Sequence, residues 1–296
     1  MMKSNSTRVL QAFFVTFLWS TSWILIKLTI TNISPLYFAG LRYLIGFIVL
    51  AIVVLIQKKV EKLSLHSFLW ISVYGVIMIT LTQGSQFIAL SILPTIMVSL
   101  ALNATPIVVA IVGYFLLKER LIGYQKLGVL LYSVGVLMYF YPFQKINGIA
   151  IGLLVALLAI VFNASSTLVG RIINQKRLTN STFLTMISMG VGSVLLLMIA
   201  SQVETFPTLD GLNVLTLLWL GVVNTALAFT LWNHALEKIT ATSASLINST
   251  MLIQIALLSW VFLSEALNLR QIIAVLIVFG GVMMVQVFKK QGQTQT

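Results

Sequence analysis

Cysteine is absent from this chain of 296 residues, and charged residues are scarce. Without cysteine the chain has no disulfides, no thiolate metal sites and no cysteine nucleophiles. Only 8% of its residues are charged, against about 25% in a soluble domain, and 59% are hydrophobic. A surface this poor in charge would aggregate in water, so the composition predicts an all-α integral membrane protein.

Ten apolar segments are long enough to cross about 30 Å of hydrocarbon as helices. They are residues 9–30, 36–57, 67–89, 94–117, 124–141, 147–170, 182–203, 212–235, 241–263 and 268–288. Their hydrophobic runs are continuous rather than alternating, which argues against a β-barrel.

Lysine and arginine are unevenly divided between the loops on the two sides of these spans. With the N-terminus inside, 14 of the 18 fall on the inner side, and only Lys27, Arg42, Lys145 and Arg270 fall on the outer side. This bias predicts a multi-pass protein of the cell membrane with both termini in the cytoplasm. It also explains the net charge of +12 without a nucleic-acid partner.

The chain repeats itself after 146 residues. Residues 86–139 align without a gap on residues 232–285, and 15 of the 54 pairs are identical. Scarce residue types are among the pairs: Ser99/Ser245, Glu119/Glu265, Gln125/Gln271 and Gly135/Gly281. Two five-helix repeats, residues 1–146 and 147–296, are therefore expected, and the odd number of spans in each makes their topologies opposite.

Several motifs carry a resemblance to a known family. They are Phe17–Lys27, Pro35–Tyr43, Ala104-Thr105-Pro106, Leu117–Leu121 around Glu119, and Leu263–Leu267 around Glu265. In these motifs and in its ten spans, the chain resembles the EamA-type family of the drug/metabolite transporter superfamily. The resemblance implies a secondary transporter working by alternating access, which exports amino acids, other metabolites or drugs.

The second half departs from the first-span motif. Ser165, Ser166 and Ile173 stand where the first half has Trp19, Ser20 and Lys27. The two halves are chemically unequal, so the substrate site need not be symmetric.

Two cations, Lys27 and Arg42, lie at similar depth on either side of the outer turn at residues 32–35. One interpretation is snorkelling to the outer interface, with Lys27 complementing the negative end of its own helix. The other is a cationic pair at the mouth of a cavity, which would attract an anionic group of the substrate.

Trp19 and Trp23 lie one helical turn apart, near mid-depth and away from the interfacial aromatic belt. With the neighbouring Ser22 they are predicted to form a cavity wall against which a substrate stacks. Interfacial anchoring is the competing interpretation.

Amides and a serine inside the spans should face the protein interior, because polar groups are costly against lipid. Interhelical hydrogen bonding explains any one of them, but some of the set should line the substrate path. The candidates are Gln83, Gln86, Asn103, Asn163, Ser166, Asn248 and Gln254.

Pro106 interrupts the hydrogen bonding of span 4, as a gate or as a simple kink. Glu119 and Glu265 end spans 4 and 9 beside Lys118, Arg120 and, further on, Arg270, and are expected to form span-end ion pairs.

All six acidic residues lie at or beyond span ends, so no buried carboxylate is available for proton or sodium coupling. We therefore expect uniport or exchange, with His234 as the one group that could couple transport to protons. An intramembrane enzyme or a sensor is the alternative, but no catalytic motif, metal site or cofactor site appears, so an enzyme is not expected. One chain suffices for the predicted mechanism, and the sequence does not indicate an oligomeric state.

Overall fold

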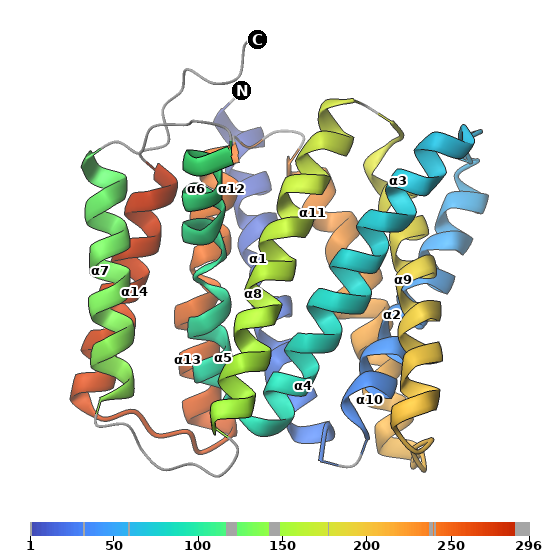
Figure 1. Ribbon diagram of the computed structural model, residues 1–296. Helices are drawn as coiled ribbons and strands as arrows, with labels where there is room; N and C mark the ends of the chain where they lie inside the picture. The colour runs from blue at the N-terminus through green and yellow to red at the C-terminus, as the bar shows by residue number, and fades with distance from the viewer. Residues whose placement is uncertain are drawn as a thin grey trace.

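The protein is a bundle of helices, seen in a computed structural model that describes residues 2–31, 33–58, 60–116, 123–141, 149–176, 178–236, 239 and 241–287 (Figure 1). Every regular element in these ranges is helical. The first half contains α1 (Met2–Thr29), α2 (Pro35–Ile56), α3 (Leu65–Gly75), η1 (Val76–Gln83), α4 (Gly84–Ile92), α5 (Thr95–Leu102), α6 (Thr105–Leu116) and α7 (Gly123–Phe140). The second half contains α8 (Ile149–Gln175), α9 (Ser181–Val203), α10 (Gly211–Gly221), η2 (Val222–Leu227), α11 (Ala228–Leu236), α12 (Ala241–Ser249), α13 (Met251–Phe262) and α14 (Leu269–Val287).

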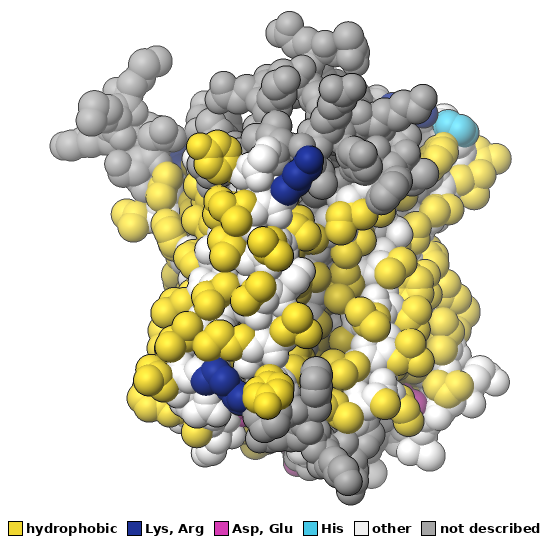
Figure 2. All heavy atoms as spheres, turned by 60° about the vertical axis from the view of Figure 1, so that its left-hand side comes forward, with side chains coloured by type: hydrophobic (Ala, Val, Ile, Leu, Met, Phe, Trp, Pro, Cys, Tyr) yellow, Lys and Arg dark blue, Asp and Glu magenta, His cyan; other side chains and the backbone are white. Residues whose placement is uncertain are grey.

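Eight helical segments of the described chain are long and apolar enough to span a bilayer. They are Thr7–Thr29, Pro35–Ile56, Leu65–Ile92, Ile149–Gly170, Ser181–Val203, Gly211–Leu236, Leu246–Leu263 and Leu269–Gln286. Each matches one of the ten predicted spans. The remaining two predicted spans correspond to the broken pair α5–α6 and to α7, which lies beside α14 over its length (Figure 1). Figure 2 shows a broad hydrophobic band with lysine and arginine side chains at its two ends, as expected of a multi-pass membrane protein.

We call the two ends of the bundle the terminal end and the distal end. α1 begins and α14 ends at the terminal end, which is the top of Figure 1. At the opposite, distal end lie the turns between α1 and α2, α4 and α5, α9 and α10, and α13 and α14.

Irregular segments recur at the spacing of the sequence repeat. The π-helices η1 and η2 begin at Val76 and Val222, which are 146 residues apart. The breaks between α5 and α6 at residues 103–104 and between α12 and α13 at residue 250 also correspond. A π-segment widens the helix locally, and such segments are frequent at functional sites.

Close helix contacts recur in reciprocal form. A Cβ on Gly75 would lie 2.5 Å from the carbonyl oxygen of Ser188, and one on Gly221 would lie 3.2 Å from that of Arg42. Gly75 and Gly221 are 146 residues apart, and so are Arg42 and Ser188. Each half thus lays the glycine before its π-helix against the same position of the other half.

The pair α7 and α14 shows the same reciprocity. A Cβ on Gly128 would lie 2.7 Å from the carbonyl oxygen of Gly281, and one on Gly135 would lie 2.9 Å from that of Ala274. Positions 128 and 274 are repeat partners, as are 135 and 281. Glycine is needed at these contacts because any side chain would force the helices apart.

The hydrophobic core is divided unequally between the two ends. One large cluster of buried residues joins α1, α2, α4, α5, α9, α10 and α13 near the distal end and continues along α7 and α14. Toward the terminal end, buried residues form four separate small clusters that each join only two to four elements. The distal end is therefore packed across the bundle, whereas the terminal end is packed in separate groups of helices.

Candidate functional site

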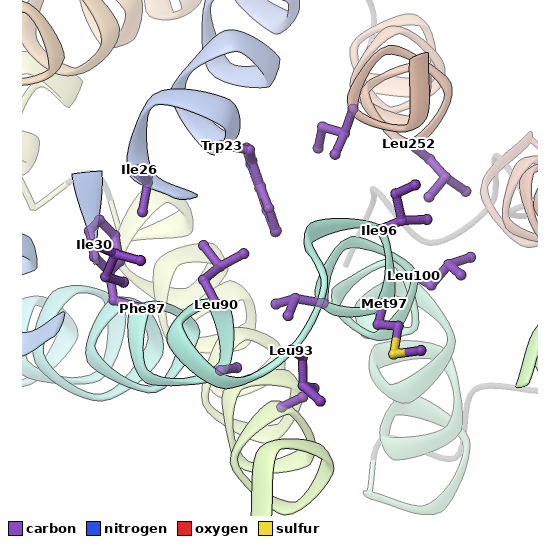
Figure 3. Packing of buried hydrophobic residues seen from close by; sticks show 14 of the residues in the cluster. Trp23, Ile26, Ile30, Phe87, Leu90, Leu93, Ile96, Met97, Leu100 and Leu252 are labelled. Atoms are coloured by element: carbon purple, nitrogen blue, oxygen red, sulfur yellow. The ribbon is translucent and has the colours of Figure 1, made fainter. Parts of the chain in front are cut away.

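Trp23 belongs to the distal packing. Its side chain is only 8% exposed and lies between Leu90 of α4 and Ile96 of α5, with Leu252 of α13 nearby (Figure 3). The tryptophan thus fills the space where helices of both halves meet. In this structure the Trp23 side chain is buried among apolar residues.

Lys27, one turn further along α1, binds the end of α4. Its Nζ donates hydrogen bonds to the carbonyl oxygens of Leu90 (2.6 Å) and Leu93 (2.8 Å). The last carbonyls of a helix lack partners within the helix and carry partial negative charge. Lys27 therefore acts as a cationic cap on α4.

Glu265 binds the helix that begins on the other side of the same turn. Its carboxylate accepts hydrogen bonds from the backbone N–H groups of Thr95 (2.8 Å) and Ile96 (3.1 Å) at the start of α5. The first amides of a helix are unpaired and favour an anion. An ion pair was expected at Glu265, and the structure gives the carboxylate two backbone partners.

Lys27 and Glu265 together hold the turn at Leu93 and Pro94 from its two sides, and we call these two side chains and that turn the turn clamp. Lys27 comes from α1 in the first half, and Glu265 follows α13 in the second half. The clamp thus binds the α4–α5 turn to both halves of the chain at the distal end.

A second carboxylate at the distal end does the same for α2. Glu204, which follows α9, accepts hydrogen bonds from the amides of Leu36 (3.0 Å) and Tyr37 (3.0 Å). The sequence analysis did not single out Glu204. A signal was present, because Pro35 and Pro94 both precede free amides at a helix start, where an acidic partner is favoured.

Arg42 lies inside the packing of α2 against η2. The residue is 5% exposed, its Nε donates to the Oγ1 of Thr225 (3.0 Å), and its guanidinium carbon lies 5.4 Å from the ring centroid of Tyr43. The two cations that the sequence placed together therefore have separate partners. Arg42 secures a π-segment, and Lys27 secures a turn.

An aromatic cluster joins α1 to α11. The ring of Trp19 lies 5.3 Å from that of Phe229 and 5.2 Å from that of Trp232, in tilted geometry. All three residues are only partly buried. Trp19 thus presents a partly open aromatic surface, whereas Trp23 is covered.

Gln254 is fully engaged between helices. Its Oε1 accepts from the Oγ of Ser20 (2.8 Å), and its Nε2 donates to the Oγ1 of Thr250 (3.1 Å) and of Thr16 (3.3 Å). This network joins α1 to the break before α13. Both amide hydrogens and the carbonyl oxygen of Gln254 have partners, so the geometry fits a structural role.

The break between α5 and α6 has a similar network. Asn103 donates to the carbonyl of Ser99 (2.8 Å), and Asn163 of α8 donates to the Oγ1 of Thr105 (3.1 Å). Pro106 follows as the second residue of α6, so the helix is interrupted just before the proline. The two hydroxyls named with this set are bound locally, Ser166 to the carbonyl of Asn163 and Ser22 to that of Trp19.

Three amides of the predicted set keep their side chains free of hydrogen bonds to the described residues: Gln83, Gln86 and Asn248. Gln86 is 8% exposed, Gln83 is half-buried and Asn248 is exposed. Gln83 and Gln86 stand where η1 meets α4, so a widened helix carries two unsatisfied amides.

Asn224 is a further polar residue that the candidate set left out. It is fully buried in η2, and its Nδ2 donates to the carbonyl of Leu18 and to the Oγ1 of Thr21 (3.2 Å). It ties the second π-segment to α1. Only the three-dimensional contact distinguishes it from the other amides of the spans.

No cluster of three or more His, Asp or Glu side chains that could hold a metal occurs among the described residues. His234 is exposed at the terminal end, with its Nδ1 within hydrogen-bond distance of Arg8. Glu119, the repeat partner of Glu265, lies outside the described residues.

Comparison with known proteins gives consistent matches. The model of the EamA-like transporter family matches residues 7–141 and 150–287. The uncharacterized transporter YoaV of Bacillus subtilis is 26% identical over 279 residues, which cover 91% of this chain and 93% of that protein. A probable amino-acid metabolite efflux pump of Escherichia coli is 27% identical over 240 residues, 77% of each chain.

The fold is also found in a solved crystal structure, with a TM-score of 0.67 at 19% identity over 95% of this chain and 98% of that one. The family match extends over nearly all of the described residues. The apolar helices are those of a protein embedded in a membrane, which agrees with a family of transporters. The chain belongs to the EamA-like transporter family.

Proposed function

We propose that this protein is a ten-span exporter of a small molecule at the cell membrane, working by alternating access between two inverted repeats. The repeats are residues 1–146 and 147–296, and a single chain is sufficient. The helical pairs α5–α6 and α12–α13 each count as one span, and α7 completes the ten. The reciprocal glycine contacts support this arrangement, because a two-fold relation turns each contact into its partner.

The observation that carries the proposal is the unequal core. In a carrier that is open to one side of the membrane, the two halves pack against each other on the closed side and are separated on the open side. The excess of lysine and arginine supports cytoplasmic termini, so the terminal end faces the cytoplasm. On this assignment the structure represents an inward-facing state with the outer, distal side closed.

The turn clamp is proposed as the outer latch. Opening the distal side separates helices of the two halves, and it would have to break the bonds from Lys27 or Glu265 to the α4–α5 turn. A hydrogen bond to a charged group contributes about 1.5–3 kcal/mol, so the latch can bias the equilibrium between states by tenfold or more.

Glu119 is proposed as the inner counterpart of Glu265. The two acids are repeat partners, as are the start of α5 and the start of α12 at Ala241. When the terminal end closes, the carboxylate of Glu119 is expected to cap α12 as Glu265 caps α5. Ile173 replaces Lys27 in the second half, so the inner latch lacks the cation.

The proposed ligand surface combines the unsatisfied amides with the open aromatic ring. Gln83, Gln86 and Asn248 offer donors and acceptors, and Trp19 offers a stacking face. Lys27 and Arg42 are already bonded, so an anionic group is not required in the substrate. Such groups would suit a small molecule with an apolar part and neutral hydrogen-bonding groups, such as an amino acid derivative or a drug.

Transport is proposed to be facilitative or by exchange, because no acidic residue lies inside a span. The direct test is counterflow in proteoliposomes that contain pooled labelled amino acids, nucleosides or lipophilic cations, with and without a pH gradient. Saturable uptake of one pool without the gradient is expected. Uptake that requires the gradient would refute the uncoupled mechanism, and no uptake of any pool would contradict the transporter proposal.

A further inference from the structure

A groove opens on the lipid-facing side of the bundle near the distal end, away from the candidate substrate surface. It has a volume of about 270 Å³ and lies between the end of α7 and the starts of α5, α8 and α14. Its wall is apolar, with Met97, Leu153 and Leu157 along it, and Tyr139, Tyr141 and Arg270 lie toward its polar end. Leu157 is 59% exposed, so the groove is open to the hydrocarbon band seen in Figure 2.

Arg270 is the unusual feature of this groove. Its Nε is shielded from solvent and has no hydrogen-bond partner in the part of the chain that the structure describes. Its guanidinium carbon lies 5.9 Å from the ring centroid of Tyr141. The nearest acid in sequence, Glu265, is already bound to the amides of Thr95 and Ile96. A buried donor without an acceptor is costly, so the site calls for one.

The surroundings of Arg270 identify the class of acceptor. Arg270 lies in the first turn of α14, where the helix dipole adds to the positive charge of the guanidinium. Arginine binds phosphate by paired hydrogen bonds, and this level of a membrane protein is where lipid phosphates lie. Small-molecule pockets usually have about 300–1,000 Å³, so a groove of this size suits an acyl chain better than a whole metabolite.

We propose that this groove binds one anionic phospholipid, with its phosphodiester on Arg270 and an acyl chain along Met97, Leu153 and Leu157. The excess positive charge at the polar end favours phosphatidylglycerol over phosphatidylcholine of the same chain length. Binding requires both headgroup and chain, so inorganic phosphate does not displace the lipid. The site is independent of the substrate and of the transport mechanism.

Native mass spectrometry of the full chain, exchanged into equal amounts of the two lipids, tests the proposal. One retained phosphatidylglycerol, preferred by roughly fivefold or more, is expected for the unmodified protein. Arg270→Gln should abolish the preference, and Arg270→Lys should restore part of it. Lys126→Gln, which removes an exposed cation at the start of α7, is the matched control and should keep the preference. Equal retention of both lipids by the unmodified protein, or an unchanged preference in Arg270→Gln, would overturn the proposal.

A photoreactive phosphatidylglycerol with a diazirine at the end of its acyl chain provides a readout of position. Crosslinks are expected on peptides that contain Leu153, Leu157 or Met97, and Leu153→Trp, which fills the groove, should remove them while Arg270 stays intact. Crosslinks spread evenly over the exposed hydrophobic side chains would mean that only the annular lipid shell had been sampled, and would contradict a defined site.

Discussion

The distal and terminal ends of the bundle contain segments that align with one another at a spacing of 146 residues, but the two ends are packed differently. At the distal end one apolar cluster joins both halves, and charged side chains cap helices across the junction. At the terminal end the buried clusters are separate. The two ends have exchangeable parts, since Glu119 and Glu265 occupy equivalent positions, but only the distal end has the lysine. We therefore propose that the difference in packing between the two ends depends on whether the outer latch at Glu265 or the inner latch at Glu119 is engaged.

The largest effect is expected from removing the carboxylate of the turn clamp. Glu265→Ala leaves the amides of Thr95 and Ile96 unpaired and weakens distal closure, and counterflow should fall by about tenfold or more. Glu265→Gln retains an acceptor and should give a smaller loss. If Glu265→Ala transports at the normal rate, the clamp is only structural.

Glu119, the proposed inner counterpart of Glu265, allows the two ends to be tested against each other. Glu119→Ala should favour the inward-facing state, and Glu265→Ala should favour the outward-facing state. Because the chain has no cysteine, a single introduced cysteine can report each state by its rate of labelling. Equal shifts in the same direction would contradict the proposed exchange of latches.

Neighbouring glycines of α14 test the tight contact with α7. A Cβ on Gly281 would lie 2.7 Å from the carbonyl oxygen of Gly128, so Gly281→Ala should destabilise the fold by about 1–3 kcal/mol. Gly280 has open space around it, and Gly280→Ala should be neutral or stabilise by up to about 1 kcal/mol. Thermal unfolding in one detergent measures both variants, and equal effects would contradict the close contact.

Two glutamines separate ligand binding from structure. Gln254→Ala breaks the bonds to Ser20, Thr16 and Thr250 and should cost about 0.6–2 kcal/mol of stability. Gln86→Ala removes an amide that has no hydrogen-bond partner among the described residues, and it should instead raise the KM for transport, with little change in thermal stability. If Gln254→Ala instead raises the KM and Gln86→Ala lowers the thermal stability, the ligand surface lies at the α1–α13 network and not where η1 meets α4.

The smallest effect is expected at Glu61, in the loop between α2 and α3. Hydrogen bonds from Thr179 and Asn180 lower the pKa of this carboxyl below its usual range. A lowered pKa in the folded state adds stability above the unfolded pKa of about 4.3, and this stability is lost as the pH falls through the folded value. Because Glu61 is exposed, thermal scans should show only a small acid-dependent loss that Glu61→Gln removes.

Apolar runs located the eight helical segments that are long enough to span a bilayer, because length and continuity are local properties of the sequence. The sequence did not predict the π-helices η1 and η2. Each begins where the chain packs closely against a distant helix, η1 against α9 and η2 against α2, and such contacts are not visible in a local pattern. The repeat contained the missing information: Gly75 and Gly221 are identical and stand at equivalent positions directly before the two π-helices.

The candidate site was predictable only in part. Residue type identified Lys27, Arg42 and the amides as polar groups inside the spans, but the partners of Lys27, Arg42 and Asn163 are carbonyls and hydroxyls of other helices. Lys27 is chemically as suited to an anionic ligand as to a helix end, and only the arrival of α4 beside α1 decides between them. The same applies to Gln86 and Gln254, which differ in what surrounds them and not in what they are.

We infer that the resting protein is packed across its distal end and is accessible from its terminal end. Gln83→Cys, in the otherwise cysteine-free chain, can be labelled with a membrane-impermeant maleimide in vesicles of each orientation. We expect rapid labelling from the side that carries the termini, slow labelling from the other side, and faster labelling from that other side when Glu265→Ala is added. If Gln83→Cys with Glu265 unchanged is labelled faster from the distal side than from the terminal side, the inferred resting state is wrong.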